Sequence, residues 1–269
     1  MCVPGCREAV QRAVSRRGFF TGAVATAAFA ATGTKPARAQ RAFTSVIDLT
    51  HTLSPAFPTF FGAPGITIER RYSLKKNGAN VNWWHVLEHA GTHLDAPLHY
   101  SESGTAVELI PAEQLVVPLA VVDVSAKAAG NADYAMNKQD LADWEAEHGR
   151  LPENCCVAMH AGWAQHVTSA RFVGKDSNGV MHFPGIHPEA TEWLLKERHV
   201  SGLAVDTLSL DQGRSKDFKT HSLWLPAGRW GLENVANLDK VPASGATLVV
   251  GVPKVKDATG APARIFALV

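Results

Sequence analysis

The sequence predicts a single α/β domain over residues 43–269, built from a mixed β-sheet with flanking helices. Three observations support this class. Short apolar runs rich in Val, Ile and Leu recur along the region and are typical of strands. Two longer segments have the apolar spacing of amphipathic helices, and no repeat, low-complexity tract or linker follows residue 43. At 269 residues and 46% hydrophobic content, the chain is also large enough to bury a sizeable core.

The first two expected strands are residues 45–53 and 66–74, and prolines punctuate the segment between them. A third strand over residues 81–90 alternates in character and leads into a histidine-rich motif. A brief helix at residues 110–115 comes before the buried strand that follows. Further strands are expected at residues 119–125, 154–163, 202–210, 246–254 and 263–269, the last two forming a hairpin or sheet pair.

Two helices are expected between these later strands. Residues 138–149 form an amphipathic pattern that ends at Gly149, a residue that favours helix termination. Residues 187–200 carry the clearest helical pattern, with Pro188 in the first turn, where its missing N–H costs nothing. The apolar residues of this second helix are Ala190, Trp193 and Leu194.

Residues 1–39 differ in character from the rest of the chain. They hold six basic residues and one acidic residue, and the segment SRRGFF places Arg16 and Arg17 before two phenylalanines. The alanine-rich run that follows is shorter than the ~20 residues needed to span a bilayer, and ARA at 37–39 has the pattern of a cleavage site. The segment resembles a twin-arginine export signal, which implies that the export machinery is a partner and that the mature domain is periplasmic and not membrane-bound. A short membrane anchor is the alternative.

Without this segment the chain has 20 basic and 24 acidic residues, a net charge of −4. A weakly acidic domain with no basic run argues against nucleic-acid binding. The adjacent Cys155 and Cys156 lie in an apolar run, which predicts that they occupy the two faces of one strand. A vicinal disulfide is the alternative in an oxidising compartment.

Residues 89–99 read HAGTHLDAPLH and suggest a metal site. Four of the chain's 12 histidines fall within residues 85–99. An isolated histidine is usually a surface or core residue, but a cluster with an interleaved aspartate offers the imidazole and carboxylate ligands that suit Zn²⁺ and Mn²⁺.

The spacing of the motif restricts its conformation. On a helix, Asp95 would lie about 240° round from His89, and the proline at position 97 would end the helix. In a straight strand, His89 and His93 would lie about 13 Å apart, too far to share an ion easily. We therefore expect a strand end that bends at Gly91 and gathers His89, His93 and Asp95. His99, beyond the proline, is expected to stand a little apart, where it is more useful as an acid/base than as a ligand.

This motif resembles the H-x-G-T-H-x-D-x-P-x-H signature of the metal-dependent cyclase family, which includes bacterial kynurenine formamidase and isatin hydrolase. Seven fixed positions in eleven make the signature specific. The resemblance extends along most of the region, through IDLTHTLSP, VAMHAGW, GLAVDTLSLD and HSLWLPAGRWGLENV. It implies a swivelling β/β/α-like fold and a homo-oligomer, a dimer or a tetramer.

The resemblance also implies roles for individual residues. His89, His93 and Asp95 become ligands of a first divalent metal, Zn²⁺ or Mn²⁺, and His99 becomes the catalytic acid/base. Family members with two metals take further ligands from a histidine and a glutamate twelve residues later. His221 and Glu233 have that spacing, with Asp95 able to bridge both ions.

The chain departs from the family pattern near its N-terminus: the family usually shows a proline and an aromatic residue before a P-G turn, where this chain reads FPTFFG. Because this segment often shapes the substrate pocket, the departure bears on the identity of the substrate more than on the chemistry. Five aromatic residues could form a wall of the pocket, or could instead pack in the core: Phe57, Phe60, Phe61, Trp83 and Trp84. His51, His85 and His160 are further candidates for contacts with the substrate or the ligands.

The function expected from these residues is hydrolysis of a C–N bond in a small molecule by metal-activated water. An aryl formamide and a small cyclic amide, such as an imide or an isatin-like ring, undergo the same step, so the motif does not separate them. Two alternatives remain: opening of a lactone or other ester, and an exported metal- or ligand-binding protein without catalysis. Retention of His99 favours an enzyme, because a pure binder needs no acid/base beside its ligands.

Overall fold

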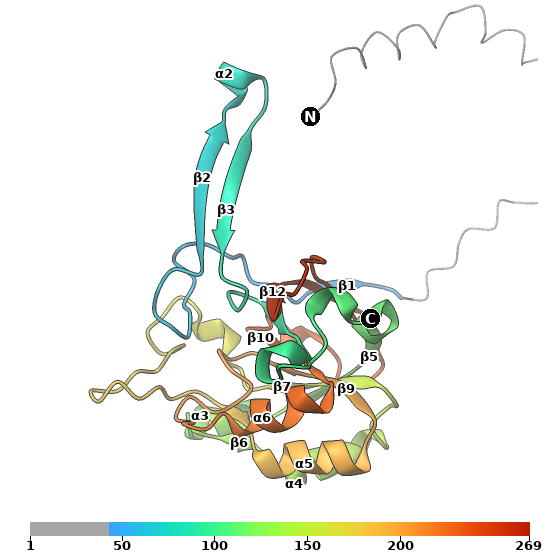
Figure 1. Ribbon diagram of the computed structural model, residues 1–269. Coiled ribbons are helices and arrows are strands. Elements are labelled where there is room, and N and C mark those ends of the chain that lie inside the picture. Colours follow the sequence, from blue (N-terminus) through green and yellow to red (C-terminus); the bar gives the residue numbers. More distant parts are fainter. Residues whose placement is uncertain (1–42) are drawn as a thin grey trace, which may run out of the picture. The chain divides into compact units, whose positions relative to one another are not determined.

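A nine-stranded mixed sheet organises residues 43–269, the part of the chain that the computed structural model describes (Figure 1). The expected α/β class is therefore confirmed, whereas the expected export signal at 1–39 lies outside the described residues. Within residues 43–269 no helix is long and apolar enough to cross a membrane. In spatial order the strands are β1 (Val46–Asp48), β13 (Arg264–Leu268), β11 (Ala246–Gly251), β5 (Val116–Asp123), β7 (Cys155–His160), β9 (Val200–Val205), β10 (Trp230–Glu233), β4 (His93–Asp95) and β12 (Gly260–Pro262).

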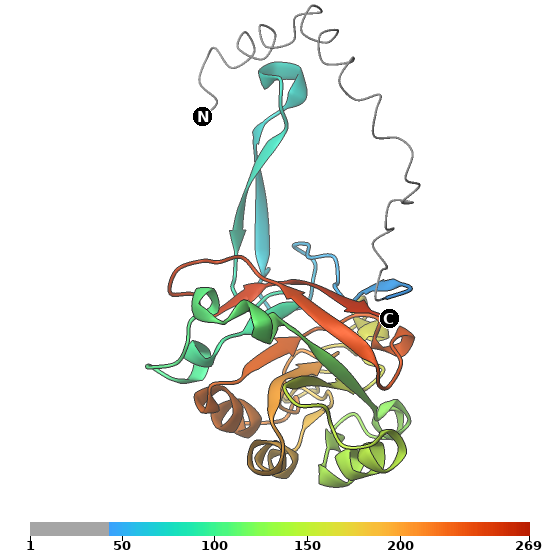
Figure 2. The same ribbon diagram turned by 90° about the vertical axis from the view of Figure 1, so that its right-hand side faces the viewer.

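The centre of the sheet is parallel and both of its sides are antiparallel. Strands β5, β7, β9 and β10 run in one direction, and helical segments connect them across one face of the sheet (Figure 2). Strands β11 and β13 pair antiparallel, as expected, and β4 pairs antiparallel with both β10 and β12. The α-helices that accompany this sheet are α3 (Ser125–Gly130), α4 (Lys138–His148), α5 (Pro188–Glu197) and α6 (Lys219–Trp224).

The two predicted helices form for local reasons. Asn137 caps α4: its side chain accepts backbone N–H groups of the first turn, and Asp140 completes a capping box. Helix α5 begins at Pro188, and the His187 side chain accepts the N–H of Glu189. The segment expected as a brief helix at 110–115 is instead a 3₁₀ turn, Ala112–Leu115.

Each face of the sheet has its own hydrophobic core. On β7, Cys155, Val157 and Met159 pack into the core beneath the helices, whereas Cys156 and Ala158 pack into the core on the opposite face. Both cysteines are buried and free, as the two-face interpretation predicts, and burial raises the pKa of the Cys155 thiol to about 12. A vicinal disulfide is therefore absent from this strand.

A separate hairpin extends from the body of the domain, and we call it the arm (Figure 1). It comprises β2 (Ile66–Tyr72), a one-turn helix α2 (Leu74–Asn77) and β3 (Val81–Val86), and its strands pair only with each other. Both strands were expected from the sequence, but their separation from the main sheet was not. A small parallel pair, β6 (Ala135–Met136) and β8 (Gly185–Ile186), completes the described strands.

Candidate metal centre

The histidine-rich motif forms a bend between the arm and strand β4. Gly91 has a φ of +65°, a left-handed conformation that other residues adopt only with strain. The expected bend at this glycine is therefore present. After the bend His93 and Asp95 lie at the two ends of β4, with their side chains on the same face.

Pairing with β10 brings Glu233 to the motif. Glu233 is the direct partner of His93 in the antiparallel register, so the two side chains lie on one face although 140 positions separate them. The short helix α6 supplies His221, whose Nε2 atom lies 3.1 Å from Glu233 Oε1. The structure thus brings together all six residues that were expected to bind metal or move protons: His89, His93, Asp95, His99, His221 and Glu233.

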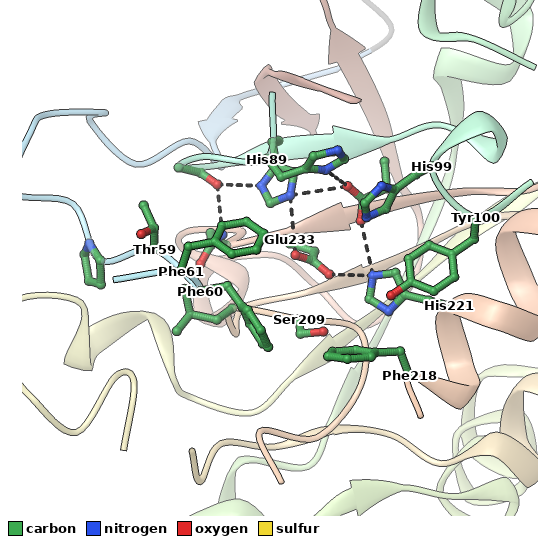
Figure 3. A pocket seen from close by; sticks show the side chains of 16 residues that line it. Thr59, Phe60, Phe61, His89, His99, Tyr100, Ser209, Phe218, His221 and Glu233 are labelled. Carbon is green, nitrogen blue, oxygen red and sulfur yellow. Dashed lines mark hydrogen bonds and ion pairs between the residues drawn. The ribbon is translucent and has the colours of Figure 1, made fainter. Parts of the chain in front are cut away.

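These six residues line one cavity of about 280 Å³ (Figure 3). Its other walls are largely aromatic and include Phe60, Phe61, Tyr100 and Phe218. Four of the ligand candidates (His93, Asp95, His221 and Glu233) are buried. The arrangement is that of a small-molecule site, with polar groups converging at one end of an apolar pocket.

The distances between the donor atoms suit a shared cation. His93 Nε2 lies 3.3 Å from Asp95 Oδ1 and 3.4 Å from Glu233 Oε2. His221 Nε2 lies 3.5 Å from Asp95 Oδ2. Ligands bound tetrahedrally at about 2.0–2.1 Å are separated from each other by about 3.3 Å. His93 Nε2 and Asp95 Oδ2 are also buried without a hydrogen-bond partner, which a bound cation would provide. The residues therefore fit a divalent metal.

The charges of the buried groups agree with this fit. Burial acts to lower the pKa of His93, but the Asp95 and Glu233 carboxylates outweigh it and raise that pKa to about 10. Burial acts to raise the pKa of Asp95, and the nearby histidines hold it well below its usual value instead. The Asp211, Asp95 and Glu233 carboxylates likewise raise the pKa of His221 against the effect of burial, so without metal the protons on His93 and His221 balance the carboxylates. A divalent cation can take the place of those protons, since ligand imidazole must be neutral.

Further residues fix how the histidines face the cavity. The Nδ1–H of His93 donates to the Gly91 carbonyl at 2.8 Å, and the Asn234 side chain donates to the same oxygen. On His221, Nδ1–H donates to Asp211 Oδ2 at 2.6 Å. In both residues Nε2 is left to face the cavity, as in the metal sites where a second hydrogen bond orients the ligand ring.

His89 is held in the same way but in the opposite orientation. Its Nδ1 lies 2.6 Å from Asp95 Oδ1, and its Nε2–H donates to Thr259 Oγ1 at 3.0 Å. The Thr259 hydroxyl in turn donates to Glu88 Oε2 at 2.5 Å. Sequence reasoning did not identify Thr259 or Glu88. Glu88 adjoins the motif, but no sequence signal marks a threonine 171 positions later.

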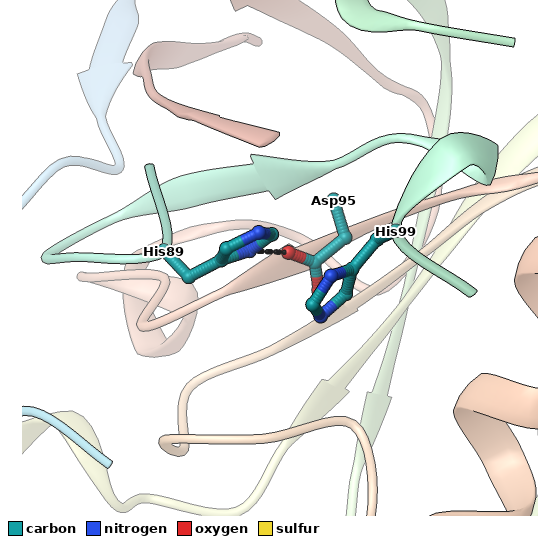
Figure 4. Close-up of side chains that lie close together, drawn as sticks. All are labelled: His89, Asp95 and His99. Atoms are coloured by element: carbon teal, nitrogen blue, oxygen red, sulfur yellow. Dashed lines mark hydrogen bonds and ion pairs between the residues drawn. The ribbon is translucent and has the colours of Figure 1, made fainter. Parts of the chain in front are cut away.

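His99 lies closer to the ligand candidates than expected (Figure 4). A ring nitrogen of His99 and donor atoms of His89 and Asp95 all lie within 4.8 Å of one another, and the His89 and His99 rings are stacked at 3.9 Å. Position alone therefore suits His99 for ligation as well as for proton transfer. Burial and the nearby histidines lower the pKa of His99 to about 4 against the opposing effect of Asp95, so the imidazole is neutral at pH 7 and can accept a proton.

The expected aromatic wall is present only in part. Phe60 and Phe61 line the cavity, whereas Phe57 is buried beside it in the core. Trp83 and Trp84 lie on β3 of the arm and line no part of the cavity of their own chain. The alternative of core packing is also wrong for these tryptophans, because both are more than half exposed. Of the further histidine candidates, His51 and His160 line a separate hollow and His85 lies on the arm, so none of them reaches the cavity.

Known proteins are similar to most of this chain. The Cyclase family model ("Putative cyclase") matches residues 47–212. Isatin hydrolase of Roseibium aggregatum is 33% identical over 83% of this chain and 91% of its own length. Kynurenine formamidase of Salinibacter ruber is 28% identical over 82% of this chain and 95% of its own length.

Solved structures agree with this relationship. Isatin hydrolase A from Labrenzia aggregata, solved with benzyl benzoate, superposes with a TM-score of 0.79. Its sequence is 36% identical, and the match covers 84% of this chain and 93% of that one. The histidine-rich motif, the fold and these matches all agree, and the chain belongs to the cyclase family.

Proposed function

We propose that this protein is a metal-dependent hydrolase that opens the C–N bond of a small cyclic amide, such as isatin or an imide, or of an aryl formamide. The observation that carries the proposal is the convergence of six histidine and carboxylate side chains at the end of one aromatic-walled cavity. The relatives named isatin hydrolase and kynurenine formamidase support the same class of reaction. A cavity of about 280 Å³ is small, which favours one compact aromatic substrate over a peptide.

The residues that hold the metal in this proposal are His89, His93 and Asp95, with His221 and Glu233 as ligands of a second ion. A bound divalent metal supplies a Lewis acid and lowers the pKa of water toward about 7. Phe60 and Phe218 both line the cavity, with their ring centroids 5.7 Å apart, and can hold a planar ring against the polar groups. Their apolar surface also excludes bulk water around the reacting amide.

His99 moves the proton. Because its imidazole is neutral at pH 7, it can take a proton from the attacking water and pass it to the departing nitrogen. The C–N bond breaks as the carbonyl carbon gains the water oxygen and the nitrogen gains the proton. In a cyclic amide the nitrogen stays attached to the opened product, whereas in an aryl formamide the amine and formate separate.

The decisive experiment replaces His99 with glutamine and alanine. Both variants are expected to keep metal and to lose turnover of isatin, N-formylkynurenine and simple cyclic imides. Full activity in either variant would show that His99 is not the acid/base. Loss of metal together with activity would show that His99 is a ligand, which the short distances to His89 and Asp95 allow. Simple lactones belong in the same screen, since faster turnover of an ester would reassign the substrate class.

Metal identity and number form a second part of the proposal. Zn²⁺ or Mn²⁺ suits the nitrogen and oxygen donors, and Asp95 lies between the two groups of ligands. Elemental analysis of the purified protein tests this part. His221→Ala is expected to halve the metal content if two ions bind, whereas His93→Ala is expected to remove all of it.

We further propose that residues 1–39 direct folded protein through the twin-arginine pathway to the periplasm, and that the mature chain assembles as a homo-oligomer of two or four copies. The SRRGFF and ARA segments support the first point. Cell fractionation of wild-type protein and of a variant in which Lys replaces both Arg16 and Arg17 tests it. Equal periplasmic amounts of the two would contradict the proposal.

A further inference from the structure

Three hydroxyl groups line the cavity of the metal centre, and one of them already has a partner for its hydrogen. The Thr59 hydroxyl donates to the Ala63 carbonyl oxygen at 2.6 Å. The hydroxyls of Tyr100 and Ser209 also belong to the cavity wall, but among residues 43–269 neither of them donates a hydrogen bond. A donor that is shielded from bulk water costs free energy unless a ligand or a water molecule accepts its hydrogen. Two donors are therefore available to a bound molecule.

The Tyr100 hydroxyl is positioned by the packing of its ring. Tyr100 ends the 3₁₀ turn Pro97–Tyr100 and directly follows His99 in the sequence. Its ring centroid lies 5.0 Å from that of the His221 ring and 4.9 Å from that of the His99 ring. The ring therefore contacts both the proposed acid/base and a proposed metal ligand. A phenol is protonated at neutral pH, so its hydroxyl can donate.

Ser209 reaches the cavity from the loop that follows strand β9. Its side chain is buried, and its Oγ atom accepts the backbone N–H of Asp211 at 3.3 Å. Asp211 in turn accepts the Nδ1–H of His221. Because Oγ serves only as an acceptor in this contact, the hydroxyl hydrogen of Ser209 remains free. Figure 3 shows the Tyr100 and Ser209 side chains pointing into the cavity, and these contacts link both of them to His221.

The two free donors require an acceptor oxygen on the ligand other than the carbonyl under attack, which faces the metal ligands and His99. Isatin and N-formylkynurenine share such an oxygen. In both molecules a ketone and the amide nitrogen are attached to adjacent carbons of one aromatic ring. A plain aryl formamide and a simple aliphatic imide have no ketone at this position. The ring ketone is a neutral acceptor beside the reacting amide, which suits neutral hydroxyl donors.

We propose that Tyr100 and Ser209 donate hydrogen bonds to a substrate ketone that lies ortho to the amide nitrogen on an aromatic ring. The inference rests on the proposed hydrolase function and narrows its substrate class to ortho-acyl anilides, open or cyclic. The two hydroxyls hold the ring, whereas bond cleavage remains the task of the metal and His99. Substrates without the ketone leave both donors unpaired and are poorer for that reason.

The test combines variants with two substrates that differ in the ketone alone. 2-Formamidoacetophenone carries the ketone, and 2-ethylformanilide has a similar shape without the oxygen. The wild type is expected to show the higher kcat/KM for the ketone. Loss of one neutral hydrogen bond is expected to lower this preference by about 3- to 10-fold in Tyr100→Phe and in Ser209→Ala. The ratio is the readout, because the electronic effect of the ketone on the amide is the same in every variant.

Thr59→Val is the matched control, because it removes a cavity hydroxyl whose hydrogen is already bound to a carbonyl. Its preference for the ketone is expected to equal that of the wild type. An unchanged preference in both Tyr100→Phe and Ser209→Ala, or an equal loss in the control, would overturn the proposal. An equal fall in kcat for both substrates would also overturn it, in favour of hydroxyls that stabilise the oxyanion of the reacting carbonyl.

Binding without turnover separates this proposal from the hydrolase function. The amines 2-aminoacetophenone and 2-ethylaniline have no amide to hydrolyse, and calorimetry measures their affinity for metal-loaded protein. Tighter binding of the ketone by the wild type, reduced in Tyr100→Phe and Ser209→Ala, would support the recognition even if no amide were hydrolysed. Equal affinity of the wild type for the two amines, or binding of neither, would overturn it. This comparison is decisive in the wild type alone if a variant folds poorly.

Discussion

Replacing Thr259 with valine tests whether a residue remote in sequence prepares His89 for metal. The substitution keeps the β-branched shape and removes the hydroxyl, which accepts the Nε2–H of His89 and donates to Glu88. Without that acceptor, the His89 ring loses the contact that fixes its orientation. We expect weaker metal binding with little change in the fold.

The size of the expected loss in metal affinity follows from the two hydrogen bonds of the Thr259 hydroxyl. Loss of a contact that orients a ligand histidine typically lowers metal affinity by 10- to 100-fold, or about 1.4–2.8 kcal/mol. The His89 side chain is 16% exposed, so water can replace part of the lost contact. The free energy of unfolding of the metal-free protein should therefore fall by only about 1 kcal/mol. The effect on metal affinity should exceed the effect on stability.

The assay is competition for metal between the protein and a chromophoric chelator, with thermal unfolding of the metal-free protein measured in parallel. Thr259→Ser is the matched control, because it keeps the hydroxyl and loses only a methyl group. We expect the serine variant to bind metal close to wild-type strength. Wild-type affinity in the valine variant, or equal weakening in both variants, would refute a positioning role for Thr259.

Three other outcomes follow from the structure. The pKa of His93 is raised to about 10 in the metal-free chain, so protonated His93 stabilises the fold fully below about pH 6.5 and this stabilisation is lost as the pH rises toward 10. The melting temperature of chelator-treated protein should therefore fall between these pH values. A rise would contradict a raised pKa for His93. Gly260→Ala should weaken metal binding, because a Cβ there would lie 2.5 Å from the His89 ring, and unchanged affinity in chelator competition would show that the ring can shift freely. Cys155 and Cys156 should resist a thiol reagent in the native state and react on unfolding; rapid native labelling, measured by absorbance, would show that β7 opens readily.

The spacing of residues along the sequence predicts only those parts of the site whose residues are close together in the sequence. His89, His93 and Asp95 fall within seven residues, so the limits of helix and strand geometry were enough to require a bend at Gly91. His221 and Glu233 could be identified only through the family resemblance, because their approach depends on the pairing of β4 with β10.

The remaining features depend on tertiary packing that spacing does not encode. Asp211 lies in a stretch that the resemblance includes, but its contact with His221 arises from the loop between β9 and α6. The alternating pattern of residues 81–90 correctly indicates a strand. It does not reveal that this strand joins a separate hairpin, which is why Trp83 and Trp84 could be misread as pocket or core residues.

The position of β4 between β10 and β12 also has a consequence for the order of events during synthesis. His93 and Asp95 leave the ribosome early, but the strands on either side of them follow only at residues 230–233 and 260–262. At about 5–20 residues per second, the first ligands wait on the order of 10–30 s for their neighbours. The metal centre is therefore completed only when the chain is nearly finished, and a nascent chain can hold the motif for most of its synthesis without a formed site.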